Sequence, residues 1–112
     1  MFSLKATLLS SGVADFCRAA EAGLQVKAHA ASGIVWGHGA APESVDRARA
    51  TLEAWRKAAA RHHGSVVVTR CPAPWKTSLD VWGPPRPDAA LMGRVKAQFD
   101  PRGLFNPGRF VV

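Results

Sequence analysis

Two spacings of apolar residues alternate along the first 70 positions of the chain. Segment 2–9 alternates apolar and polar residues, which is the period of a β-strand with one buried face. The next segment spaces its apolar residues three and four apart, which predicts the buried face of a helix. These residues are Val13, Phe16, Cys17 and Ala20. We expect Ser10 or Ser11 to cap this helix and Gly23 to end it.

The next 46 positions continue the pattern with two more strands, a longer helix and a last strand. Strands are predicted at 24–30 and 34–38, a helix from about Glu43 to Gly64, and a fourth strand at 65–69. The resulting order β-α-β-β-α-β is that of the ferredoxin-like α+β fold, an antiparallel four-stranded sheet with both helices on one face.

The face of this sheet turned away from the helices is predicted to be open, polar and basic, because polar residues occupy the alternate strand positions. On the first two strands that face would carry Lys5, Thr7, Gln25, Lys27 and His29.

The remaining residues divide into two segments. Residues 71–87 hold many prolines and two tryptophans, which predicts an extended, non-helical connection lying against another surface. Residues 88–112 are predicted to be a helix, begun by Asp88 and stopped at Asp100-Pro101, followed by a tail with two tight turns. We therefore divide the chain into a ferredoxin-like unit at 1–70, a connection at 71–87 and a C-terminal helix and tail at 88–112.

Length and charge narrow the class of protein. A chain of 112 residues has room for one small domain, which is too little for most complete cofactor enzymes. The net charge is +7, and the basic excess lies mainly in the second half, which indicates an anionic ligand or an acidic partner. Cys17 and Cys71 have neither metal-ligand spacing nor the density of a disulfide scaffold, and no segment is apolar enough to span a membrane. A reduced, cytoplasmic protein is expected.

Two motifs carry a resemblance to a known family. The tail Asp100-Pro-Arg-Gly-Leu-Phe-Asn-Pro-Gly-Arg109 matches every fixed position of the C-terminal pattern of FAD-linked oxidases of the vanillyl-alcohol-oxidase type. His29-Ala-Ala-Ser-Gly33 is similar to the His-Ala-Gly-(Asn/Asp)-Gly segment in the cap domain of that family. Taken whole, the chain most resembles the C-terminal part of FAD-binding subunits of glycolate oxidases.

The resemblance implies an FAD-dependent oxidoreductase acting on a 2-hydroxy acid such as glycolate. Its cap domain would close the substrate cavity. FAD would be held mainly by an upstream FAD-binding domain, because no Gly-rich pyrophosphate loop occurs in the sequence. We expect a truncated reading frame or a separate cap domain that is inactive and flavin-free alone. Implied partners are a second flavoprotein subunit and an iron–sulfur subunit, through which a cytoplasmic protein would lie peripherally at a membrane.

The resemblance also suggests site residues. His29 is the candidate catalytic residue, a base for the substrate hydroxyl, with an ordinary surface histidine as the alternative. Asn106 and Arg109 are candidates for facing the cofactor, although Asn106 also suits a turn and Arg109 a salt bridge between domains. Lys27 and Arg102 are candidates for the substrate or the domain junction.

No metal site is expected. Metal-binding relatives continue the histidine motif with Asn and a second His, where this chain has Ile34 and Trp36. An indole cannot replace an imidazole as a metal ligand. His38, two positions beyond Trp36, leaves a shifted ligand open.

A stand-alone ferredoxin-like module is the alternative function, docking protein or, less favoured, RNA. RNA binding on such a sheet needs aromatic residues on the two central strands. The strands taken as central offer Lys5, Thr7 and 65–69, with no aromatic residue other than Phe2. No nucleic acid is therefore expected as a partner.

Overall fold

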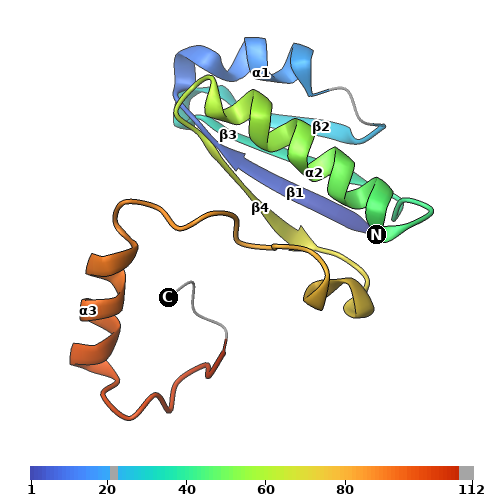
Figure 1. Cartoon of the computed structure of the whole chain (residues 1–112). Helices are drawn as coiled ribbons and strands as arrows, with labels where there is room; N and C mark the ends of the chain where they lie inside the picture. The colour runs from blue at the N-terminus through green and yellow to red at the C-terminus, as the bar shows by residue number, and fades with distance from the viewer. Residues whose placement is uncertain (21–22, 109–112) are drawn as a thin grey trace.

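A computed structural model describes residues 1–20 and 23–108, and the order of elements is the one predicted (Figure 1). The strands and helices are β1 (Phe2–Thr7), α1 (Val13–Ala19), β2 (Gln25–His29), β3 (Ile34–Gly39), α2 (Val45–Ala60), β4 (Ser65–Arg70) and α3 (Ala89–Phe99). Short 3₁₀ turns lie at Ser10–Gly12, Ala30–Ser32 and Ala73–Thr77.

The four strands form one antiparallel sheet in the order β2-β3-β1-β4. Figure 1 shows α1 and α2 on the same side of this sheet. The α+β ferredoxin-like fold is thus confirmed. The two central strands are β1 and β3, so the expectation that placed 65–69 at the centre is wrong. After α2 the chain returns on the free side of β1, which makes β4 an edge strand.

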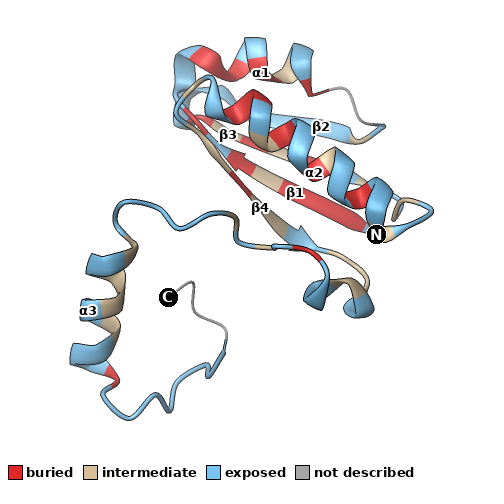
Figure 2. Ribbon diagram, viewed as in Figure 1, coloured by how far each residue is buried: buried red, intermediate tan, exposed pale blue. Residues whose placement is uncertain are grey.

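The core lies between the sheet and these two helices (Figure 2). From β1 it takes Phe2, Leu4 and Ala6, all fully buried, which confirms the alternation predicted for that strand. Phe16 of α1 and Trp55 of α2 meet over the sheet in an edge-to-face contact, with ring centroids 5.2 Å apart. The two helices are therefore joined through their largest buried side chains.

The glycine at position 37 of β3 makes room for Trp55. A Cβ atom at Gly37 would lie 2.5 Å from Cη2 of the Trp55 indole, which is closer than such contacts allow. Gly37 belongs to the helix-covered face of β3, between Trp36 and His38 on the opposite face. The pair Gly37 and Gly39 therefore reflects packing in the core.

The helix starts differ in how they are capped. Neither Ser10 nor Ser11 caps α1, because both lie in a 3₁₀ turn and the N-cap is Gly12, with no side-chain hydrogen bond. Ser44 caps α2, and its side chain accepts a hydrogen bond from the backbone N–H of Arg47 at 3.2 Å.

The segment after β4 is extended except at one place. The backbone N–H of Val68 donates to the carbonyl of Val81 at 2.8 Å, which attaches the segment to the free edge of β4. The expectation of a wholly non-helical connection is wrong at Ala73–Thr77, where Pro74 lies at the start of a 3₁₀ turn. Proline is tolerated there because first-turn N–H groups have no partner inside the helix.

Helix α3 lies between Asp88 and Asp100 as predicted, but Asp88 makes no side-chain capping hydrogen bond and none of the helix residues is buried. In Figure 1 it stands apart from the sheet. The radius of gyration is 15.1 Å, against about 13 Å for a compact chain of this length. The C-terminal part therefore adds little to the core. Within 1–20 and 23–108, no helix is both long and apolar enough to cross a membrane.

Candidate functional site

The sheet face turned away from the helices, called the open face from here on, carries three rows of neighbouring side chains. Strand register sets these rows, and on β1 and β3 the alternate residues Leu4, Ala6 and Val35 are buried in the core. The rows across β2, β3 and β1 are Gln25–His38–Ser3, Lys27–Trp36–Lys5 and His29–Ile34–Thr7. All five polar residues predicted for this face thus occupy it.

The open face is positively charged. The four strands, all within the described chain, contain Lys5, Lys27 and Arg70 but no aspartate or glutamate. Neither Lys5 nor Lys27 has an ion-pair partner among the residues that the structure describes. The positive charge of this face is therefore available to an anionic ligand or partner.

His29, the candidate catalytic residue, ends β2 and is exposed to solvent. Its Nδ1 lies 2.7 Å from Oγ of Ser32, a contact in which either atom donates, depending on the histidine tautomer. Nε2 is the acceptor nitrogen in the tautomer in which Nδ1–H donates to Ser32, whereas in the other tautomer Nε2 carries the hydrogen. The hydrogen bond orients the imidazole ring through Nδ1 and does not involve Nε2.

The glycine of the histidine motif has a structural role. Gly33 closes the turn between β2 and β3 with a φ of +66°, and its carbonyl accepts a hydrogen bond from Leu8 N–H at 2.8 Å. A Cβ atom there would lie 1.9 Å from the Leu8 carbonyl oxygen. Both the backbone conformation and the lack of space require glycine.

His38 and His29 lie in different rows of the open face. His38 Nδ1 lies 3.0 Å from Oγ of Ser3, whereas His29 pairs with Ile34, four residues back along β3. Four strand residues span about 13 Å, so the two imidazoles do not share one site. In the described part of the chain, no group of three or more His, Cys, Asp or Glu side chains is placed to hold a metal ion.

Trp36 is the residue of this face that sequence reasoning missed. It was weighed only as a lost metal ligand, yet it is half-buried on the central strand β3 between Lys27 and Lys5. The alternation of Ile34, Trp36 and His38 around buried Val35 was the available signal. The expectation that the central strands lack an aromatic residue on this face is therefore wrong.

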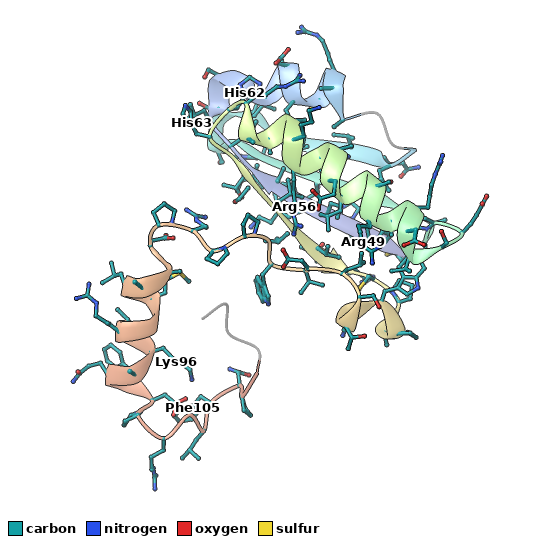
Figure 3. All side chains as sticks on the ribbon, in the orientation of Figure 1. Arg49, Arg56, His62, His63, Lys96 and Phe105 are labelled. Carbon is teal, nitrogen blue, oxygen red and sulfur yellow. The ribbon has the colours of Figure 1, made fainter. Side chains whose placement is uncertain are left out.

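The C-terminal tail is held by one carboxylate. Asp100 accepts hydrogen bonds from the backbone N–H groups of Leu104 at 2.8 Å and Phe105 at 3.0 Å, and it also pairs with the ammonium group of Lys96. Lys96 donates as well to the Phe105 carbonyl at 2.9 Å (Figure 3). The Lys96 hydrogen bond, followed by those from the Phe105 and Leu104 N–H groups, lowers the pKa of Asp100 to about 2.

The other fixed positions of the tail motif suit its turns. Gly103, Asn106 and Gly108 have φ values of +62°, +49° and +70°, a region that glycine and asparagine tolerate best. The turn interpretation of Asn106 is thereby supported, and its role toward a cofactor stays a prediction. Arg102 is exposed, and Arg109 lies outside the described residues.

Acid should loosen this tail. The pKa of Asp100, about 2, lies below its ordinary value of 3.8, so the ionised carboxylate stabilises the turn fully above about pH 4. That contribution is lost as the pH falls from about 4 toward 2. We expect the Leu104 and Phe105 amide protons to lose protection from hydrogen exchange in that range.

The variant Asp100→Asn should show this loss at neutral pH, because an amide cannot pair with Lys96 as a carboxylate does. Asp88→Asn is the matched control, since the Asp88 carboxylate pairs with Arg86, at 3.4 Å, and Arg86 lies outside the tail. Equal protection of Leu104 in both variants at pH 7 would contradict the assignment of Asp100.

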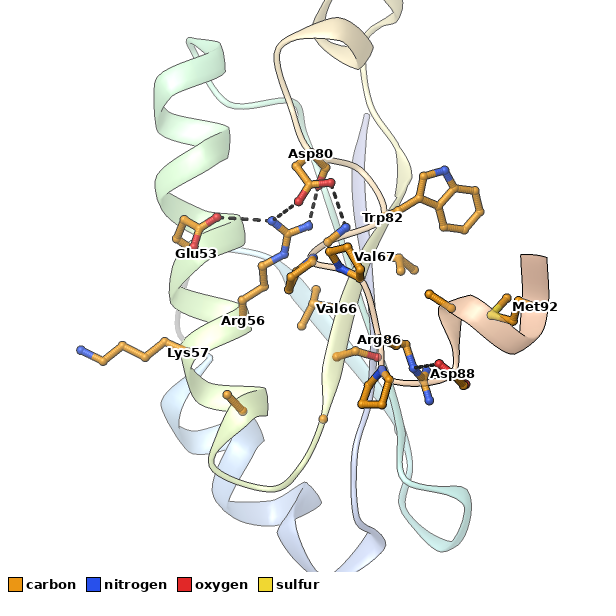
Figure 4. A pocket seen from close by; sticks show the side chains of 18 residues that line it. Glu53, Arg56, Lys57, Val66, Val67, Asp80, Trp82, Arg86, Asp88 and Met92 are labelled. Carbon is orange, nitrogen blue, oxygen red and sulfur yellow. Dashed lines mark hydrogen bonds and ion pairs between the residues drawn. The ribbon is translucent and has the colours of Figure 1, made fainter. Parts of the chain in front are cut away.

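A groove of about 850 Å³ lies between α2, β4 and segment 80–92 (Figure 4). Arg56 of α2 spans it, donating to the Asp80 carbonyl at 2.5 Å and contacting the carboxylates of Asp80 at 3.5 Å and Glu53 at 3.3 Å. These contacts fasten the connection to the α/β unit. Within the described part of the chain, no predicted site residue lines the groove, so we interpret it as an internal contact between the connection and the α/β unit.

Comparison with known proteins gives one match. Residues 85–110 match the family model described as FAD linked oxidases, C-terminal domain. The matched segment contains α3 and the Asp100 tail and is less than a quarter of the chain. Neither a curated protein nor a solved structure matches. The match supports the resemblance of this C-terminal segment to FAD-linked oxidases.

Residues 1–20 and 23–108 contain no Gly-rich loop of the common dinucleotide-binding type. Dinucleotide sites of the common type place a Gly-rich loop between a strand and a helix N-terminus. Between β1 and α1 the chain has a 3₁₀ turn instead, and Gly37 and Gly39 lie inside β3 against Trp55 and Leu24. The family match implies FAD at the level of the family.

Proposed function

We propose that this chain is the C-terminal part of an FAD-dependent oxidoreductase that acts on a 2-hydroxy acid such as glycolate. In this proposal residues 1–70 are a cap domain whose open face closes the substrate cavity, and 88–112 is a tail that contacts the FAD-binding domain. The observation that carries the proposal is the family match at 85–110, which falls on a helix and tail with an uncovered apolar surface.

That apolar surface is large for so short a segment. Three residues at helical spacing on α3 and two more in the tail each expose 49% or more of their surface: Leu91 (55%), Val95 (49%), Phe99 (82%), Leu104 (60%) and Phe105 (67%). Soluble proteins seldom leave contiguous apolar side chains in water without a partner. We take the FAD-binding domain as the occupant of this surface.

Each candidate residue has a role in this proposal. FAD, held by the separate domain, supplies the oxidising chemistry. His29 Nε2 accepts the proton of the substrate hydroxyl, and Lys27 in the next row attracts the substrate carboxylate. Asn106 and Arg109 would contact the cofactor, and Arg102 the substrate or the domain junction. A second flavoprotein subunit and an iron–sulfur subunit are the further partners proposed, with peripheral membrane association through them.

The first test of this function is association. The chain alone should show no flavin absorbance near 450 nm, roughly where bound flavins absorb. Mixed with the FAD-binding domain encoded beside it, the chain should form a complex. Phe99→Ser should weaken that complex about tenfold or more, because a mostly exposed phenylalanine of α3 would then be buried at the junction.

Leu9→Ser is the matched control, because Leu9 is 53% exposed but lies between β1 and α1. Isothermal titration calorimetry would compare the two variants. Equal weakening by both, or coding sequence around Met1 that contains no FAD-binding domain, would rule out the proposal.

One observation favours a second candidate, a stand-alone module that binds single-stranded RNA. Trp36 lies on a central strand between two lysines, an arrangement that suits base stacking and phosphate contact. Binding of a labelled oligonucleotide at micromolar protein, weakening steeply with salt, would support this candidate. RNA binding ranks second because the family match does not support it.

A further inference from the structure

The middle row of the open face brings two cations and one aromatic ring together. Lys27, Trp36 and Lys5 are direct neighbours on β2, β3 and β1. Strands lie about 4.8 Å apart, so the two lysine backbones are about 10 Å apart with the indole between them. Lysine has a flexible four-carbon stem, which allows both ammonium groups to reach the same small anion above the ring.

The electrostatics of the row favour an anion. Lys5 is half-buried, and the four strands around it hold no acidic side chain. No carboxylate within the described residues pairs with either lysine. A carboxylate ligand would relieve the mutual repulsion of the two cations.

Trp36 gives the row an apolar wall. The ring contact found among the described residues is that of Phe16 with Trp55, and Trp36 takes no part in it. An indole that is half-exposed on a polar face gains from contact with the apolar part of a ligand. Along β3 the indole lies between Ile34 and His38. Across the sheet it lies between Lys27 and Lys5.

We propose that Lys5, Lys27 and Trp36 form a binding site for a small carboxylate, in which the two ammonium groups hold the carboxylate and the indole contacts an apolar substituent. The identity of the carboxylate as a 2-hydroxy acid rests on the proposed function. His29 is a diagonal neighbour of Trp36 on β2, about 7–8 Å away between Cα atoms. Because the indole contacts an apolar substituent, the site favours 2-hydroxy acids that carry such a substituent over glycolate, which has none.

The site can be tested on the 112-residue chain without flavin. Mandelate is the probe, and the indole N–H resonance of Trp36, assigned with Trp36→Phe, is the readout by NMR. Saturable shifts are expected with mandelate, several-fold weaker binding with glycolate, and none with the neutral mandelamide. Lys5→Gln and Lys27→Gln should each weaken mandelate binding about fivefold, the size of one partly exposed ion pair.

Lys57→Gln is the control, since Lys57 is an exposed lysine of α2, the helix on the opposite face. It should bind mandelate as the unchanged chain does. Equal shifts with mandelate and mandelamide, or unchanged affinity in both open-face lysine variants, would overturn the site. So would an oligonucleotide that displaces mandelate and binds far more tightly, because the row would then serve nucleic acid.

The outcomes distinguish failure of the carboxylate site from failure of the proposed function. Mandelate binding without any FAD-binding domain would leave a carboxylate site in a protein of another function. A complex with that domain and no mandelate shift would leave the function standing and remove the site.

Discussion

Gly33→Ala should destabilise the fold far more than Gly23→Ala, although both glycines have a φ of +66°. A Cβ atom at Gly23 has nothing within 4 Å, so its cost is that of the left-handed backbone alone, about 1–2 kcal/mol. At Gly33 the Cβ atom would lie 1.9 Å from the Leu8 carbonyl oxygen, so the turn must open. We expect the free energy of unfolding to fall by about 4 kcal/mol or more, as it does for substitutions that force a severe steric clash.

Urea denaturation followed by circular dichroism measures both variants. Because a small domain has only about 5–15 kcal/mol of stability, Gly33→Ala is expected to shift the midpoint strongly or prevent folding. If the two alanine variants unfold at similar urea concentrations, the close approach of Gly33 to Leu8 is not the reason for glycine in the histidine motif.

Trp55→Ala should cost about 3–5 kcal/mol, the usual loss for a fully buried large aromatic side chain. Trp55 is completely buried, contacts Phe16 and fills the space above Gly37. Its removal opens a cavity where α1, α2 and β3 meet. The expected result is a much lower urea midpoint with loss of near-ultraviolet circular dichroism.

Trp82→Ala is the comparison for this variant, because Trp82 is 52% exposed beside the groove and outside the core. Its cost should stay near 1 kcal/mol or below. Similar midpoints for the two variants would mean that the core does not depend on the Phe16–Trp55 contact.

The sequence pattern predicted where the strands and helices lie along the chain better than it predicted which strands pair in the sheet. Alternation in 2–9 and 34–38 identified two strands because one face of each is buried by the helices. The same pattern does not state which strands lie side by side. That choice depends on where the chain returns after α2, and for this reason β4 was wrongly placed at the centre.

Local details were predictable only where a single residue decides them. Gly33 and Gly103 both have positive φ, and the sequence predicted a turn at Gly103 within Asp-Pro-Arg-Gly. The cap of α1 was not predictable, because a 3₁₀ turn uses Ser10 and Ser11 before the helix begins. The Ala73–Thr77 turn was missed since proline excludes a helix interior but permits a first turn.

The candidate site was predictable in part. Lys27 and His29 were placed on the open face from alternation alone, and register confirms that placement. Trp36 was missed because its importance comes from its neighbours, Lys5 and Lys27, which lie 31 and 9 positions away in sequence. The catalytic role of His29 stays a prediction, since it depends on a cofactor held by another domain.

The carboxylate of Asp100 also bears on how the tail would meet a partner. Its hydrogen bonds join Lys96, Leu104 and Phe105 within a single stretch of chain, so the tail acquires its shape from local contacts. A segment ordered beforehand loses less conformational entropy on association than one that must fold at the interface. A partner therefore meets a tail that is already ordered by these contacts and exposes the apolar side chains of Leu104 and Phe105, so we expect association to need little rearrangement.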